Sequence, residues 1–173
     1  MIGDPFSLNT TLGPMGHERA FDAVKSDITK AVQKGAEIIH GEIGYDMQDS
    51  QFQNGFWQQP VVLENIEFGS EMYLHEFYGP VFCLYRVHNL QEALTYANKS
   101  DHGKSATVFS ASEYNCKTLA QNLRVGLVHI NNAPVTSTSF PVAGIKGSGF
   151  GSNNSSSQDG LMNLVNRKLI VNN

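Results

Sequence analysis

Between Gly13 and Gly35, apolar residues recur every three or four positions, with lysine, aspartate and glutamine between them. This spacing is typical of a helix with one apolar face, and Pro14 near its start and Gly35 at its end are residues that helix boundaries favour. The pattern therefore predicts a long amphipathic helix. The side chains expected to point inward are Ala20, Phe21, Val24, Ile28, Ala31 and Val32.

Continuous apolar runs predict β-strands after a polar stretch from Glu42 to Asn54, which we expect to be an exposed loop. The run PVFCLYRV at 80–87 is apolar on both faces, so we expect it to lie in the centre of its sheet. The other predicted strands are PVVLENI at 60–66, SATVFSA at 105–111, GLVHINN at 126–132 and KLIVN at 168–172.

Two further helices separate these strands. One covers 89–100 with Asn89 as its N-cap, and the other covers 112–125 with Ser112 as its N-cap. Strand, helix, strand, helix, strand with short connections is typical of parallel strands joined by right-handed crossovers. We therefore predict an α/β fold with a parallel-type open sheet flanked by helices. The side chains expected to point inward on the first of these helices are Leu90, Ala93, Leu94 and Ala97.

The segment from 132 to 157 shows no hydrophobic period and is rich in Gly, Ser, Thr and Asn. A short helix, QDGLMNLVN at 158–166, is expected between this segment and the last strand.

Length and charge narrow the class of protein. A chain of 173 residues suits one domain, and a net charge of −4 with no basic run argues against binding to nucleic acid or to an anionic membrane surface. No apolar stretch is long enough to cross a membrane, and the N-terminus lacks the pattern of a signal peptide. We therefore expect a cytoplasmic protein that binds a small molecule or another protein.

The cysteines and histidines indicate neither a disulfide framework nor a metal site. Cys83 and Cys116 form no CxxC motif, and we expect both to be buried thiols. The six histidines are scattered, and no pair has ligand spacing on a helix. The segments HGKS at 102–105 and GSGFGSNN at 147–154 approach nucleotide-binding and nucleophile motifs, but they lack the glycines that these motifs require.

A carboxylate precedes an aromatic cluster and a Gly-Pro step in MYLHEFYGPVF at 72–82. Glu76 thus stands before the predicted strand at 80–87, at the kind of position where parallel α/β proteins gather their binding sites. An ionised carboxylate only accepts hydrogen bonds, and it suits a pair of sugar hydroxyls. The alternative is an ordinary exposed carboxylate at a turn, and this stretch alone leaves both interpretations open.

The order of several motifs resembles the C-terminal part of the catalytic domain in the aldehyde dehydrogenase family, across essentially all 173 residues. The most specific is HEFYGPVF at 75–82, which is similar to the family's Glu-Glu-(Ile/Phe)-Phe-Gly-Pro-Val. Other segments that resemble the family are GDPFSLNTTLGPM at 3–15, GFWQQPVVLENI at 55–66, EALTYANKSDHGKSATVFS at 92–110 and GLVHINNAPVTSTSFPVAGIKGSGFG at 126–151.

This resemblance implies an oxidoreductase that uses NAD or NADP to oxidise an aldehyde to a carboxylic acid. Glu76 corresponds to the glutamate that binds the nicotinamide ribose hydroxyls, and Tyr78 to the aromatic residue beside the nicotinamide. The loop at 132–142 would border the aldehyde pocket. The chain 1–173 would form a single partial catalytic domain, and its last strand, about 167–172, would belong to an oligomerisation sheet, which implies a homo-oligomer.

The sequence also departs from the family pattern. His75 replaces the first glutamate of the motif, and Val142 replaces a common pocket aromatic. The family's cysteine nucleophile, general-base glutamate, oxyanion asparagine and nucleotide-binding sheet belong to sequence upstream of the motif at 3–15, and neither Cys83 nor Cys116 has the context of that nucleophile. We therefore expect no catalytic residue in this chain, no aldehyde oxidation by the chain alone and very weak cofactor binding.

The leading hypothesis is a fragment of an NAD(P)-dependent aldehyde dehydrogenase, whether from a truncated gene, an engineered truncation or a proteolysed chain. One alternative is a non-catalytic interaction module that retains the fold. Another is an unrelated small α/β enzyme. The sequence identifies neither the aldehyde nor the choice between NAD and NADP.

Overall fold

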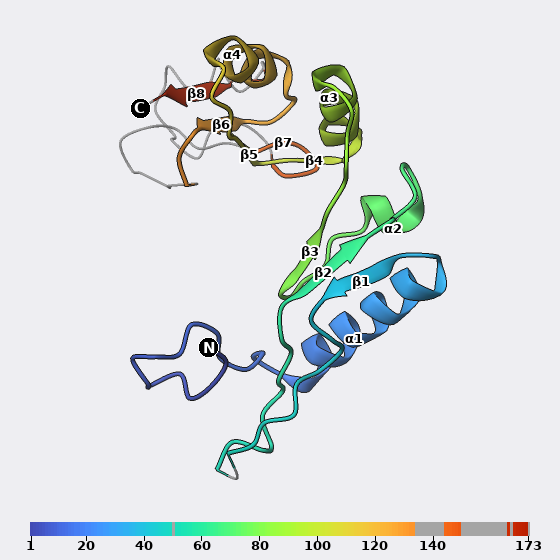
Figure 1. The fold of residues 1–173 in the computed structure, drawn as a ribbon, viewed down its shortest axis with the longest axis vertical. Coiled ribbons are helices and arrows are strands. Elements are labelled where there is room, and N and C mark those ends of the chain that lie inside the picture. Colours follow the sequence, from blue (N-terminus) through green and yellow to red (C-terminus); the bar gives the residue numbers. More distant parts are fainter. Residues whose placement is uncertain (50, 134–143, 150–165, 167, 173) are drawn as a thin grey trace. The chain divides into compact units, whose positions relative to one another are not determined.

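The computed structural model describes residues 1–49, 51–133, 144–149, 166 and 168–172. The chain divides into two compact units, Met1–Arg86 and Val87–Asn173 (Figure 1). Each unit combines helices with a small open sheet, so the α/β class predicted from the sequence is confirmed. The prediction of a single partial catalytic domain over 1–173 stays a prediction.

Unit 1, Met1–Arg86, contains a three-stranded sheet with a long helix along one face (Figure 1). The strand order is β1-β2-β3, with β1 antiparallel to β2 and β2 parallel to β3. A one-turn helix, α2, precedes β3 and was not predicted from the sequence, because one turn is too short to show a period. The elements are α1 (Glu18–Gln33), β1 (Glu37–His40), β2 (Val61–Glu64), α2 (Glu71–Leu74) and β3 (Val81–Cys83).

Helix α1 begins and ends at residues that satisfy its backbone groups. The Ala20 amide donates a hydrogen bond to Nδ1 of His17, the N-cap, at 3.0 Å. After the last turn, Gly35 has a φ of +101°, a conformation that glycine adopts without strain. The predicted long helix is thus confirmed, with its first turn at Glu18, four residues after Pro14.

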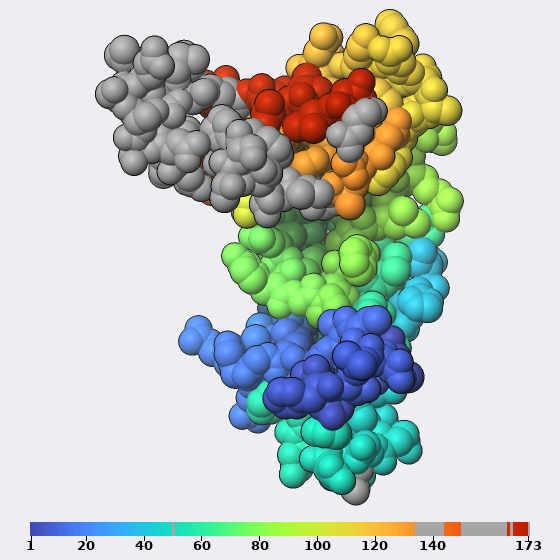
Figure 2. Space-filling model, turned by 90° about the vertical axis from the view of Figure 1, so that its left-hand side faces the viewer, coloured from blue at the N-terminus to red at the C-terminus, as the bar shows by residue number. Residues whose placement is uncertain are grey.

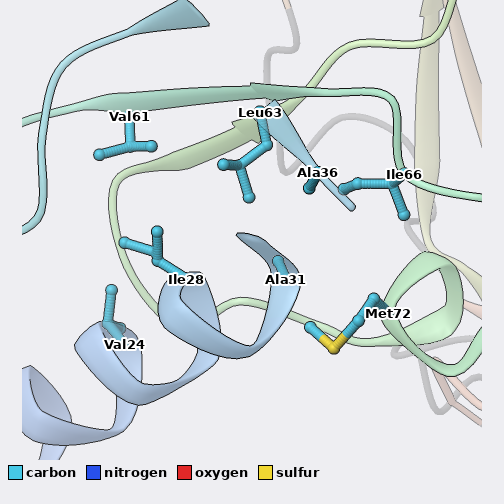
Figure 3. Close-up of a cluster of buried hydrophobic side chains, with 8 residues drawn as sticks. All are labelled: Val24, Ile28, Ala31, Ala36, Val61, Leu63, Ile66 and Met72. Carbon is cyan, nitrogen blue, oxygen red and sulfur yellow. The ribbon is translucent and has the colours of Figure 1, made fainter. Parts of the chain in front are cut away.

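The core of unit 1 forms where the apolar face of α1 meets the sheet. Figure 3 shows Val61 and Leu63 of β2 pointing toward Ile28 of α1. Val32 was expected to point inward, but 41% of its surface is exposed, because α1 contacts the sheet through a narrower stripe than the periodicity suggested. The buried cluster consists of Val24, Ile28, Ala31, Ala36, Val61, Leu63, Ile66 and Met72.

The prediction that the strand at 80–87 lies in the centre of its sheet is wrong. Among the residues that the structure describes, β3 pairs only with β2 and is an edge strand. Val81 and Cys83 pack against the core, whereas Phe82, on the opposite face, is 64% exposed. The apolar pattern on both faces therefore reflects one face that packs against the core and one face that is largely exposed.

The N-terminal segment of unit 1 has no helix and only isolated bridges, between Ile2 and Leu12 and between Met15 and Phe56. Figure 2 shows this segment, in dark blue, on the surface of the unit. Phe6 and Leu8 are almost fully exposed there.

Unit 2, Val87–Asn173, contains a three-stranded parallel sheet in the order β5-β6-β8 and a separate antiparallel pair, β4 with β7. The predicted strands at 80–87 and 105–111 thus lie in different sheets. The elements are α3 (Leu90–Lys99), β4 (His102–Gly103), β5 (Ser105–Val108), α4 (Glu113–Asn122), β6 (Leu127–Ile130), β7 (Ile145–Lys146) and β8 (Leu169–Asn172).

The two helices of unit 2 begin at the predicted caps. The side chain of Asn89 accepts a hydrogen bond from the Glu92 amide at 2.9 Å, and Ser112 accepts one from the Asn115 amide at 3.3 Å. Ala97 was expected to point inward but is exposed, so α3 uses a smaller face than predicted. Both helices pack on one face of the sheet in a cluster of Leu94, Val108, Cys116, Ala120, Leu123, Val125, Val128 and Ile130.

The last predicted strand is confirmed as β8, and it pairs with β6 of the same chain. Its role in an oligomerisation sheet stays a prediction. The short helix predicted at 158–166 lies outside the described residues, except for its last position. In the part of the chain that the structure describes, no helix is long and apolar enough to span a membrane.

Candidate functional site

The segment that connects α2 to β3, 75–79, carries both residues that the sequence singled out. It begins at His75, whose φ of −70° and ψ of 138° end the helical turn and start an extended stretch. The chain then bends at Tyr78, Gly79 and Pro80 before β3 begins. Contacts of the individual residues show which of them face α1 and the core.

Three positions of the segment contact α1 or the core beneath it. Nε2 of His75 lies 2.9 Å from Oδ2 of Asp27 on α1. Phe77 is half-buried and packs against the core cluster. At Gly79, a Cβ atom would lie 2.7 Å from Cγ2 of Val24, so the backbone passes too close to α1 for any side chain.

Backbone hydrogen bonds fix the end of the segment at the sheet. The Val61 amide of β2 donates to the Pro80 carbonyl at 2.9 Å, and the Val81 amide donates to the Gly79 carbonyl at 2.8 Å. The turn into β3 is thus attached to the neighbouring strand as well as to α1.

Glu76 and Tyr78 occupy the alternate positions and are exposed. Tyr78 has 77% of its surface open to solvent, and Glu76 is also exposed. The structure therefore brings a carboxylate and an aromatic ring to the exposed side of a segment whose other side is anchored. A carboxylate can accept hydrogen bonds from hydroxyl groups, and an aromatic face can pack on a flat ring. Their role in binding a cofactor stays a prediction.

Neither cysteine of the chain has the open environment of a reactive thiol. Burial raises the pKa of the Cys83 thiol, and a hydrogen bond with Tyr85 offsets part of this shift. Cys116 is 2% exposed, and its Sγ donates to the Ser110 carbonyl at 3.5 Å. Reactive cysteines are accessible to solvent, unlike Cys116, and have a lowered pKa, unlike Cys83. The described residues contain no group of three or more His, Cys, Asp or Glu side chains that could hold a metal ion.

The loop expected to border an aldehyde pocket, 132–142, lies outside the described residues after Ala133. Its start is well anchored, because the Asn131 side chain accepts from the Ser110 amide and donates to the Ser110 carbonyl, both at 2.9 Å. Sequence reasoning did not identify Asp27 as part of the site, since its link to His75 spans 48 positions.

Comparison with protein families finds that the aldehyde dehydrogenase family matches residues 1–170. A succinate-semialdehyde dehydrogenase [NADP(+)] of Deinococcus radiodurans is 33% identical over 168 residues, which are 97% of this chain and 34% of that protein. An aldehyde dehydrogenase of Paenarthrobacter nicotinovorans is 32% identical over 98% of this chain and 35% of that protein. The chain thus spans about a third of the length of the curated relatives it matches.

Solved structures agree with the sequence matches. Betaine aldehyde dehydrogenase of Staphylococcus aureus, in complex with NAD+, superimposes with a TM-score of 0.82 at 28% identity, over 87% of this chain and 30% of that one. Succinic semialdehyde dehydrogenase of Streptococcus pyogenes, in complex with NADP+, gives 0.80 at 30% identity, over 87% and 32%. These matches confirm the fold that the sequence motifs implied.

The contact between Gly79 and α1 predicts that Gly79→Ala destabilises unit 1. The added methyl group would lie 2.7 Å from Val24 Cγ2, so the segment must move away from α1, at a cost of about 1–3 kcal/mol in the free energy of unfolding. Val24→Ala removes the obstructing methyls, so the double variant should lose less than the sum of the two single losses. Urea unfolding, followed by the fluorescence of Trp57, the single tryptophan, measures the free energy of unfolding of each variant.

Gly16→Ala is the matched control, because a Cβ at Gly16 meets nothing within 4 Å. A loss of stability in Gly79→Ala as small as that in Gly16→Ala would contradict the steric conflict between position 79 and Val24. So would a double variant in which the losses of Gly79→Ala and Val24→Ala add.

Proposed function

Because this chain belongs to the aldehyde dehydrogenase family, we propose that it supplies the nicotinamide end of the cofactor site of an NAD- or NADP-dependent aldehyde dehydrogenase. The observation that carries this proposal is the segment 75–79, which exposes Glu76 and Tyr78 on one side while its other side is anchored to α1 and the core. A carboxylate and an aromatic ring held in this way suit a ribose and the flat ring attached to it.

Each residue has a separate role in this proposal. The carboxylate of Glu76 accepts hydrogen bonds from the two hydroxyls of the nicotinamide ribose, and charged acceptors make the stronger bonds of this kind. The ring of Tyr78 packs beside the nicotinamide. When the cofactor is bound, its nicotinamide takes up the hydride that the aldehyde loses on oxidation. Positioning the ring near attack distance is the contribution of these two side chains.

The relatives do not identify which of the two cofactors or which aldehyde this chain uses. The solved relatives include one in complex with NAD+ and one in complex with NADP+. The names of these relatives refer to succinate semialdehyde and to betaine aldehyde. The proposal therefore extends to an aldehyde substrate and to either cofactor.

We also propose that this chain alone does not oxidise an aldehyde. The family resemblance implies a cysteine thiolate as the nucleophile, and neither cysteine of this chain suits that role. The Cys83 thiol is partly buried with a raised pKa, and Cys116 is buried inside the core of unit 2. The chain would act as one part of the complete catalytic unit.

Cofactor binding by the isolated chain is expected to be weak and local. NAD+ should bind with a dissociation constant on the order of millimolar or worse, because only the nicotinamide end of the cofactor is contacted. In an NMR titration with NAD+, the amide signals of 75–79 should shift, and Glu76→Ala should weaken binding about tenfold, since it removes a charged acceptor.

Glu113→Ala is the control for this titration, since Glu113 is also an exposed carboxylate but lies on α4, paired with Lys117. Micromolar binding, or shifts confined to residues outside 75–79, would contradict the proposed cofactor site and favour a different use of the fold.

Aldehyde oxidation by the isolated chain is expected to be undetectable, because the Cys83 thiol is partly buried with a raised pKa and Cys116 is buried. The absorbance of reduced nicotinamide, followed with aliphatic, aromatic and semialdehyde substrates, measures this. The comparison protein is the double variant Cys83→Ser/Cys116→Ser. Turnover by the wild-type chain above the rate of this double variant would show that one of the two cysteines acts as a nucleophile.

A further inference from the structure

His75 directly precedes Glu76, and its side chain contacts Asp27 in the middle of α1. We infer that His75 and Asp27 form a clamp that sets the direction in which Glu76 and Tyr78 point. His75 is then a positioning residue of the cofactor site, and this inference rests on the proposed function.

The geometry of the contact is that of a direct hydrogen bond. Nε2 of His75 lies 2.9 Å from Oδ2 of Asp27, and the two side chains are 35% and 18% exposed. The other carboxylate oxygen of Asp27, Oδ1, lies 3.6 Å from Nζ of Lys30 one turn along the helix. Asp27 is thus held between a residue of its own helix and a residue of the segment.

The imidazole ring also contacts the core side of the segment. The rings of His75 and Phe77 meet edge to face, with centroids 5.0 Å apart and planes at 89°. This arrangement is favourable for aromatic pairs. Because Phe77 packs against the core cluster, the ring of His75 lies between the helix and a second anchored side chain.

The direction of the His75 side chain affects the direction of the Glu76 side chain. The backbone at His75 is extended, and successive side chains of extended backbone point in opposite directions, so holding the side chain at 75 toward α1 directs the side chain at 76 away from it. Gly79 against Val24 fixes the far end of the same stretch. Removal of the contact at 75 takes away one restraint on the segment between Leu74 and Phe77.

A positioning role predicts different effects on global stability and on cofactor binding. A partly exposed ion pair or hydrogen bond contributes little to the stability of a whole protein. Removing the clamp should therefore leave global unfolding nearly unchanged while it loosens 75–79 and weakens cofactor binding. A residue needed only for stability would show the opposite pattern.

The test compares the full chain with Asp27→Ala, His75→Ala and His75→Gln. Glutamine keeps an N–H donor near the position of Nε2, so it should restore most of what alanine removes. Glu113→Gln is the control, because it removes a carboxylate that pairs with Lys117 in the other unit. Urea unfolding confirms that the variants remain folded.

Two readouts decide the outcome. Backbone ¹⁵N order parameters of 75–79 should fall from about 0.85 to below about 0.6 in Asp27→Ala and His75→Ala, and should recover in His75→Gln. The dissociation constant for NAD+, from the amide shifts of the same segment, should rise about fivefold in the two alanine variants and less than about twofold in His75→Gln.

Unchanged order parameters in both alanine variants would overturn the clamp, as would a His75→Gln variant that behaves like His75→Ala. If the wild-type chain shows no shift at 75–79 with NAD+, the proposed cofactor site is wrong. The order parameters still decide whether His75 and Asp27 hold the segment.

Discussion

The packing of α1 on one face of the β1-β2-β3 sheet is the constraint on which the candidate site depends. Val24 is buried in the core cluster and also lies where a side chain at position 79 would have to go. One turn along the helix, Asp27 contacts His75. The same helix thus contributes an apolar stripe to the core and two contacts to the segment that carries Glu76 and Tyr78.

These two kinds of contact have different consequences. Burial of Ile28, Leu63 and their neighbours supplies stability roughly in proportion to the apolar area removed from water. The polar contact at His75 is partly exposed and adds direction more than stability. Glu76 and Tyr78 stay accessible in this arrangement, because the contacts with α1 and the core are made by His75, Phe77 and Gly79.

Sequence patterns predicted the elements whose signals are local. The period of α1, the caps at Asn89 and Ser112 and the strand at 126–132 each depend on residues close together in the chain, and the structure confirms them. Strand neighbours depend on distant pairing, so the edge position of β3 and the split into separate sheets could not be predicted. The two-residue strands β4 and β7 are too short to show a period. In the site, the motif indicated Glu76 and Tyr78, whereas the support from Asp27 depends on tertiary contact across 48 positions.

We propose that the exposed residues of 75–79 receive the nicotinamide and its ribose. Intermolecular nuclear Overhauser effects between NAD+ and the chain, recorded at cofactor concentrations high enough for measurable occupancy, test it most directly. We expect contacts from the nicotinamide protons to the Tyr78 ring and from the ribose protons to the side chain of Glu76. Contacts from the nicotinamide to residues elsewhere in the chain, with none to Tyr78, would contradict it.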